Sequence, residues 1–184
     1  ADATNNWDVA LGRWVSDVLT DAVTFTAGTD VWQCCFGALE SNAAANDVSH
    51  IHIYITSGDT DTVQGTLVAD KIASLNTPEW GTTAAGDLFD GVTNNAIDTT
   101  VTANVGDRIV VEIGYQAQNT DTASYTGTMN YGNTGATDLT DASANVTTEP
   151  GWFEFSITVP SSSVSPSTSI SPSVSISPSV SASP

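Results

Sequence analysis

The amino-acid sequence predicts an all-β protein: an antiparallel β-sandwich of the jelly-roll type, followed by an extended Ser/Pro-rich C-terminal tail. Three observations lead to this prediction. Apolar and polar residues alternate in eight short segments of residues 1–160, as in strands with one buried and one solvated face. Turn-forming residues separate these segments, and helical periodicity is scarce. About eight strands in a domain of this length favour a jelly roll.

The expected strands follow one another along the body of the chain. Their ranges are 22–26, 31–39, 50–56, 62–68, 97–103, 107–115, 124–131 and 152–159. Thr and Val dominate these ranges, and β-branched residues suit a half-buried sheet. The loops between them are rich in Gly, Asn, Asp and Ser, as in residues 57–59, 94–95 and 132–135.

The alternation is clearest in the ranges 107–115 and 152–159. In the first range, one side of the strand carries Ile109, Val111, Ile113 and Tyr115, and the other carries Arg108, Val110, Glu112 and Gly114. In the second, Phe153, Phe155, Ile157 and Val159 oppose Trp152, Glu154, Ser156 and Thr158. We expect the more apolar side of each strand to be the buried one.

Composition limits the partners of the chain. It carries 3 basic and 21 acidic residues, for a formal net charge of −18. Nucleic acid would therefore be repelled, and binding to anionic membranes is disfavoured for the same reason. No run of 18 apolar residues is present, so we expect no insertion into a membrane.

We expect one domain over residues 1–160 and a separate tail over 161–184. Residue 1 is alanine, which fits a secreted chain after removal of a signal peptide and equally fits a trimmed one. The expected location is extracellular, either secreted or on the surface of a cell or virion. Cys34 and Cys35 are adjacent, so a bond between them would be strained. We expect one buried and one partly exposed thiol, with a bridge to another subunit as the alternative.

The tail follows a parity rule. From Ser161 to Ser183 every odd position is serine, and proline recurs every six residues at even positions. In an extended strand, serine would occupy one face and Val, Ile and Pro the other. The N–H groups of one edge would all remain, because proline removes donors from the other edge alone. The pattern favours a β-type or groove-bound segment, with a flexible mucin-like stalk as the alternative.

Both faces of the tail supply candidate sites. The serine face offers positions for O-linked sugar, and the candidates on it are Ser161, Ser163, Ser165, Ser167, Ser169, Ser171, Ser173, Ser175, Ser177, Ser179, Ser181 and Ser183. Thr168, at an even position, is a further candidate. The apolar face is expected to contact a neighbouring subunit, and the candidates are Val164, Ile170, Val174, Ile176 and Val180.

Two further kinds of contact are expected in the body. Trp7 and Trp14 precede the clear strands, and aromatic residues are favoured in subunit interfaces, so we expect interface roles for both. Tryptophan rings that stack on sugars are the alternative. Asn145 begins the one N-glycosylation sequon of the chain and is the N-glycosylation candidate.

Catalytic patterns are weak. Glu112 and Glu154 lie on the polar side of their strands and would form a glycosidase-like pair if they shared a sheet face, but solvated carboxylates are the more common outcome. No nucleophile elbow or P-loop is present. We expect no enzymatic activity and no cofactor. The Asp-rich segments 59–61 and 138–141 offer oxygen ligands for Ca²⁺, without the spacing of a defined calcium loop.

Three segments resemble a known domain. They are LESNAAAN (39–46), VGDRIVVEIG (105–114) and EPGWFEF (149–155). Together they resemble an uncharacterised β-sandwich domain of large surface and virion proteins of environmental bacteria and phages. The whole chain also resembles subunits of extracellular, sugar-coated filaments from environmental water samples. The resemblance implies a jelly-roll-like fold and an extracellular structural setting.

The expected function is that of a structural subunit in an extracellular helical filament. The chain would form a homopolymer by head-to-tail contacts, and its tail, carrying covalent glycans, would lie along a neighbouring subunit. The alternative is a carbohydrate-binding or adhesion module of a phage virion or cell-surface protein.

Overall fold

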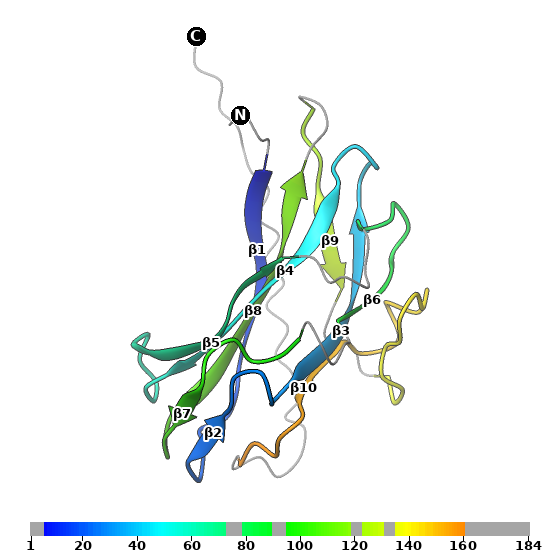
Figure 1. Cartoon of the computed structure of the whole chain (residues 1–184). Coiled ribbons are helices and arrows are strands. Elements are labelled where there is room, and N and C mark those ends of the chain that lie inside the picture. The colour runs from blue at the N-terminus through cyan, green and yellow to red at the C-terminus, as the bar shows by residue number, and fades with distance from the viewer. Residues whose placement is uncertain (1–5, 73–78, 90–94, 119–122, 131–134, 161–184) are drawn as a thin grey trace.

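The structure is a computed structural model (Figure 1) that describes residues 6–72, 79–89, 95–118, 123–130 and 135–160. All the tail residues proposed for glycosylation or for subunit contact, from Ser161 to Ser183, lie outside the described residues. Within the described part the chain forms strands and no helix, which confirms the all-β prediction. It accordingly contains no helix long and apolar enough to cross a membrane.

Ten strands make up the described part of the body. They are β1 (Asn6–Val15), β2 (Val23–Phe25), β3 (Trp32–Glu40), β4 (Asp47–Thr56), β5 (Val63–Ile72), β6 (Ala85–Phe89), β7 (Val101–Ala103), β8 (Arg108–Gln118), β9 (Gly127–Asn130) and β10 (Trp152–Phe155). Eight of them correspond to the expected ranges. Strands β1 and β6 were not expected, and the last strand ends at Phe155 rather than at residue 159.

The strands form a sandwich of antiparallel sheets (Figure 1). The first sheet has the order β1-β8-β4-β5, and the second has the order β10-β3-β6 with β9 also paired to β3. A short ribbon of β2 and β7 lies at one end. Every strand pairing is antiparallel, as the alternating pattern predicts.

The core lies between the two main sheets. From β8 it receives Ile109, Val111, Ile113 and Tyr115, all less than 10% exposed, so the predicted inner side of this strand is confirmed. From β10 and the residues after it come Phe153, Phe155, Ile157 and Val159, which pack against the core while remaining partly exposed. The inner sides of both strands were therefore predicted correctly.

A buried polar contact links the two sheets inside the core. Ser49 on β4 donates its hydroxyl to the carboxylate of Asp87 on β6. The indole Nε1 of Trp80 donates to Ser49 Oγ at 2.7 Å and to Asp87 Oδ2 at 3.2 Å. A buried carboxylate is tolerated because it receives hydrogen bonds, and this network therefore fixes β6 opposite β4.

The two cysteines occupy opposite faces of β3. Cys34 belongs to the main core, whereas Cys35 packs with Leu139 and Val146 of the segment that covers the outside of the second sheet. Both are free and fully buried, so the expectation of one partly exposed thiol was wrong. Burial, reinforced by the charge of Asp87, raises the pKa of Cys34 well above its usual range and that of Cys35 to about 12.

The position of β1 depends on a glycine in β8. Gly114 pairs with Ala10, and a Cβ at this position would overlap the carbonyl oxygen of Val9. We predict that Gly114→Ala lowers the free energy of unfolding by about 2 kcal/mol, because β1 must move away from β8 to accommodate the methyl group.

Urea unfolding monitored by tryptophan fluorescence measures this change. Gly81→Ala is the matched control, because the nearest atom to its new Cβ would be 3.7 Å away. Equal stability of the two variants would show that β1 does not approach β8 as closely as described.

Candidate functional site

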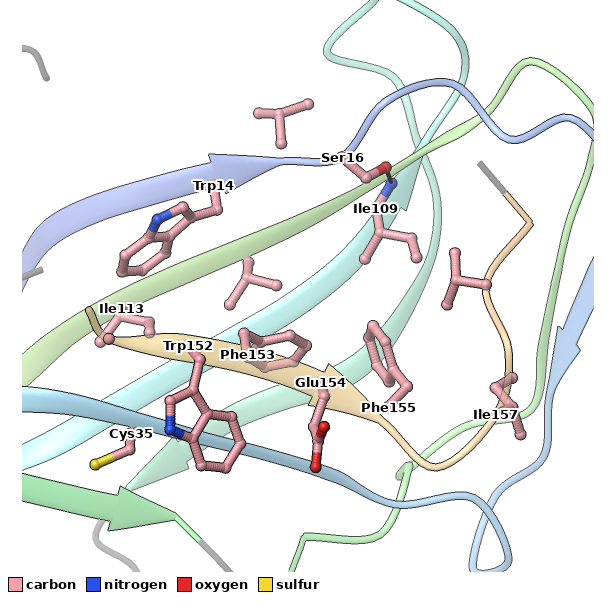
Figure 2. A pocket seen from close by; sticks show the side chains of 14 residues that line it. Trp14, Ser16, Cys35, Ile109, Ile113, Trp152, Phe153, Glu154, Phe155 and Ile157 are labelled. Atoms are coloured by element: carbon pink, nitrogen blue, oxygen red, sulfur yellow. Dashed lines mark hydrogen bonds between the residues drawn. The ribbon is translucent and has the colours of Figure 1, made fainter. Parts of the chain in front are cut away.

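A groove opens between the two main sheets along their β1 and β10 edges (Figure 2). Its volume is about 520 Å³. Trp14 of β1 lies on one side, Phe153 and Phe155 of β10 lie on the other, and Ile109 of β8 lies between them. The lining of the groove is predominantly apolar, and we treat the groove as the candidate functional site.

Five parts of the described chain supply the lining. Strand β1 and the residue after it contribute Trp14, Val15 and Ser16; β3 contributes Cys35; β8 contributes Ile109, Val111 and Ile113; β10 and the residue before it contribute Gly151, Trp152, Phe153, Glu154 and Phe155; and the segment after β10 contributes Ile157 and Val159. Trp14 is 36% and Val15 52% exposed. Among the described residues these are two of only four large apolar side chains with such exposure.

Stacked aromatic rings form the β10 side of the groove. The ring of Phe153 lies 6.0 Å from Trp32 and 5.0 Å from Phe155, centroid to centroid. Phe155 in turn lies 5.0 Å from Phe25. Contacts of this kind hold the rings in fixed orientations, so this side presents a firm apolar wall.

Charge is nearly absent from the groove. Its one charged lining residue is Glu154, which is exposed and accepts a hydrogen bond from the side-chain amide of Gln33. Figure 2 shows the Glu154 carboxylate directed away from Phe153 and Trp14. The one hydroxyl of the lining, Ser16 Oγ, already accepts a hydrogen bond from the backbone N–H of Ile109 at 2.9 Å. The groove therefore suits an uncharged, apolar occupant.

Both strands beside the groove are sheet edges. In the described part of the chain, β1 pairs with β8 alone and β10 with β3 alone. Ser156 donates its N–H to Val31 at 2.8 Å, and backbone groups alternate in direction along a strand. The N–H groups of Phe153 and Phe155 therefore point to the outer edge of β10. Such an edge is able to pair with an added strand.

The described chain ends beside this groove. After β10, the side chains of Ile157 and Val159 line the cavity, and the carbonyl oxygen of Pro160 accepts the N–H of Thr20 at 3.1 Å. That hydrogen bond fixes the end of the segment 156–160 against the loop after β1. The Ser/Pro tail therefore begins at one end of the groove.

The residues singled out in the sequence fall into separate places. Trp14 lines the groove, whereas for Trp7 the structure gives only its register in β1, opposite Ala117. Asn145 is exposed, and its Nδ2 donates to Glu149 Oε1 at 3.1 Å. The proposed tail sites lie outside the described residues.

The remaining tryptophans do not provide exposed stacking platforms. Trp32 is 1% and Trp80 4% exposed. Trp152 is half-buried and donates its indole N–H to the Leu139 carbonyl oxygen at 2.8 Å. Trp14 is therefore the one tryptophan of the described residues whose side chain is known to be substantially exposed.

The carboxylate pair considered from the sequence as an alternative to solvated carboxylates does not form. Glu112 lies on β8 in the first sheet and Glu154 on β10 in the second, so they do not share a sheet face. Glu112 binds Arg13 in an ion pair of 2.5 Å. In the calcium-candidate segment 59–61, Asp59 binds Arg108 at 2.7 Å. Among the described residues no three acidic, His or Cys side chains gather as metal ligands.

A cluster of buried carboxyl groups was missed by the sequence analysis. Glu40 at the end of β3 and Asp47 at the start of β4 are each 1% exposed, and the backbone N–H of Asp47 donates to Glu40 Oε2 at 3.1 Å. The sequence did indicate that Glu40 is buried. Glu40 lies at an even position of β3, on the same side of the strand as Phe36 and Ala38, both of which are buried.

The surroundings of these carboxyl groups favour their neutral form. Burial, a hydrogen bond with Glu79 and the charges of Glu79 and Asp47 raise the pKa of Glu40 to about 7, although the backbone hydrogen bond opposes this. Burial and then the charge of Glu79 raise the pKa of Asp47 to about 6. The β3–β4 connection thus brings together acidic groups that resist ionisation.

Comparisons of the chain with protein-family models, with curated proteins and with solved structures return no match. The features of the chain that bear on its function are the groove, the charge of the body and the sequence of the tail.

The buried carboxyl cluster predicts a pH dependence of stability. A carboxyl group whose pKa is raised by folding contributes stability that is fully present below its unfolded value, about 4, and is lost as the pH rises through the folded value. The folded values here are about 7 for Glu40 and about 6 for Asp47. We predict that Glu40→Gln exceeds the wild type in stability at pH 8 by about 2 kcal/mol, with little difference at pH 4.

Urea unfolding at a series of pH values measures this difference. Asp17→Asn, at an exposed position, is the control and should follow the wild-type curve. If Glu40→Gln shows the same difference from the wild type at pH 4 and at pH 8, the prediction is wrong.

Proposed function

We propose that the protein is a structural subunit of an extracellular helical filament, built as a homopolymer with a jelly-roll-like body and an O-glycosylated C-terminal tail that contacts neighbouring subunits. One observation carries this proposal. An apolar groove lies between two sheet edges without strand partners in the described residues, and an uncharged, alternating segment of 24 residues begins at its end. An enzymatic role is not part of the proposal.

The charge distribution supports assembly through the tail. Residues 161–184 contain no charged side chain, so the formal charge of −18 belongs entirely to residues 1–160. Bodies of like charge repel one another over distances of about a Debye length. Contacts made through uncharged surfaces, such as the groove and the tail, avoid this repulsion.

The resemblance to subunits of sugar-coated filaments, stated from sequence, agrees with this proposal. O-linked sugar on the serine face of the tail would remain in solvent while the Val, Ile and Pro face makes contact. The exposed ring of Trp14 favours a second candidate, a carbohydrate-binding or adhesion module, because an exposed tryptophan is suited to stacking on a sugar.

The proposal predicts that assembly depends on the apolar face of the tail. Negative-stain electron microscopy of the full chain should show filaments. A chain carrying Val164→Ser, Ile170→Ser, Val174→Ser, Ile176→Ser and Val180→Ser keeps its length and its prolines but loses the apolar side chains, each of which contributes about 1.5–3 kcal/mol when buried. This chain should remain monomeric.

The control is a chain of the same length in which five serines, Ser163, Ser169, Ser173, Ser175 and Ser179, are replaced by threonine. It should still form filaments, because the apolar face is unchanged. Far-UV circular dichroism should show the same β-signal for all three chains. Monodisperse particles of the unmodified chain under every condition, or filaments from the Val/Ile-to-Ser chain, would contradict the proposal. If the unmodified chain forms only monodisperse particles, its binding to a glycan array would favour the adhesion module.

A further inference from the structure

We infer that the β1–β10 groove of one subunit is the docking site for part of the tail, residues 161–184, of a second copy of the chain. The alternating Val, Ile and Pro side chains enter the groove, and the backbone of the docked segment adds a strand to one of the two unpaired edges. This inference rests on the proposed function and names the partner and the contact surface that the filament requires.

The groove and the tail are chemically complementary. The groove is lined by Trp14, Val15, Phe153, Phe155, Ile157 and Val159 together with the isoleucine and valine side chains of β8. Its one charged lining residue binds Gln33. The tail carries no charge and presents an apolar residue or proline at nearly every second position. A charged peptide would be repelled by a body of charge −18 if acidic, and would leave a cation against an apolar wall if basic.

The backbone of the tail has the hydrogen-bonding groups that docking at a sheet edge requires. A segment that docks beside a sheet edge needs N–H groups on the side that faces this edge. All tail prolines occupy even positions, so the N–H groups of the odd positions remain together on one edge. The outer edge of β10 supplies the complementary groups, because the backbone C=O groups of Phe153 and Phe155, which accept hydrogen bonds, point outward together with their N–H groups. A spacer has no need for this arrangement.

The length of the tail indicates that it docks on a second copy of the chain. Twenty-four residues in extended conformation reach about 80 Å, whereas the ten-residue strand β1 spans about 33 Å. The subunit's own groove would therefore hold less than half of the tail. The alternating pattern nevertheless continues to Val180, so the distal repeats have an apolar face that extends beyond the subunit's own groove and that the groove of another subunit can cover.

Photocrosslinking in mixed assemblies tests the inference. One preparation carries photoreactive p-benzoylphenylalanine in place of Trp14, and a second preparation is ¹⁵N-labelled and carries no probe. The two are mixed before assembly and then irradiated. Cleavage after Glu154 releases residues 155–184 as one fragment, because no acidic residue follows. Mass spectrometry then shows whether the fragment attached to the probe is labelled.

The expected result is a crosslink from the groove to the labelled fragment, because that fragment comes from another copy. A crosslink to the unlabelled fragment alone means that each tail fills its own groove, and it overturns the inference. A crosslink to any other segment overturns it as well. Val15, also exposed in the groove, gives a second probe position if the Trp14 substitution disturbs folding. Val63, 53% exposed on β5 at the opposite edge of the first sheet from β1, is the control for the Trp14 probe and should give no tail crosslink.

A tail with exchanged parity tests the hydrogen-bonding argument. Substitutions S165P, P166S, S171P, P172S, S177P and P178S keep the composition and every Val and Ile but move three prolines to odd positions. Each lost hydrogen bond weakens docking by about 1 kcal/mol, so the crosslink yield should fall at least about ten-fold. An unchanged yield would overturn the strand-addition part of the inference.

Electron microscopy of the same samples separates this inference from the proposed function. Filaments without a tail crosslink in the groove would leave the filament proposal standing and refute the docking site. Absence of filaments at all would refute the proposed function, and a tail crosslink in small oligomers would then still identify the groove as the docking site.

Discussion

The backbone of an edge strand has N–H and C=O groups without partners on its outer side. The position of the groove in this protein depends on where the edge strands of its two main sheets lie. The first sheet ends at β1 and the second at β10, and in the described part of the chain neither has a partner on its outer side. Because the two edges border the same side of the sandwich, the interior between them is open and the groove of Figure 2 results. A closed barrel would have removed both edges.

The sequence could predict the fold class and most strands because their alternation is local. Two strands escaped prediction for physical reasons. In β1 the pairing register shifts between Ala10 and Gly12, so that a bulge changes which parity faces inward and the alternation is interrupted. In β6 the inward positions hold Asp87, whose burial depends on hydrogen bonds from Ser49 and Trp80 rather than on apolar character.

The groove could be predicted only in part. The apolar side of residues 152–159 was visible in the sequence, and so was Trp14 as a contact residue. The sequence could not show that these segments, more than 130 positions apart, border one cavity, because this depends on which strands end each sheet. The Glu40–Asp47 pair was equally hidden, since the parity of Glu40 was visible but its closeness to Asp47 depends on the turn between β3 and β4.

The adjacent cysteines of β3 have a consequence for the reactivity of the two thiols. Their thiols lie on opposite faces of the strand, are fully buried and have raised pKa values, so the reactive thiolate is scarce and shielded from oxidants. Modification of Cys34 requires separation of the two main sheets, whereas modification of Cys35 requires only that the segment containing Leu139 and Val146 detach. Modification of Cys34 would therefore report separation of the two sheets, and modification of Cys35 would report detachment of the covering segment from β3.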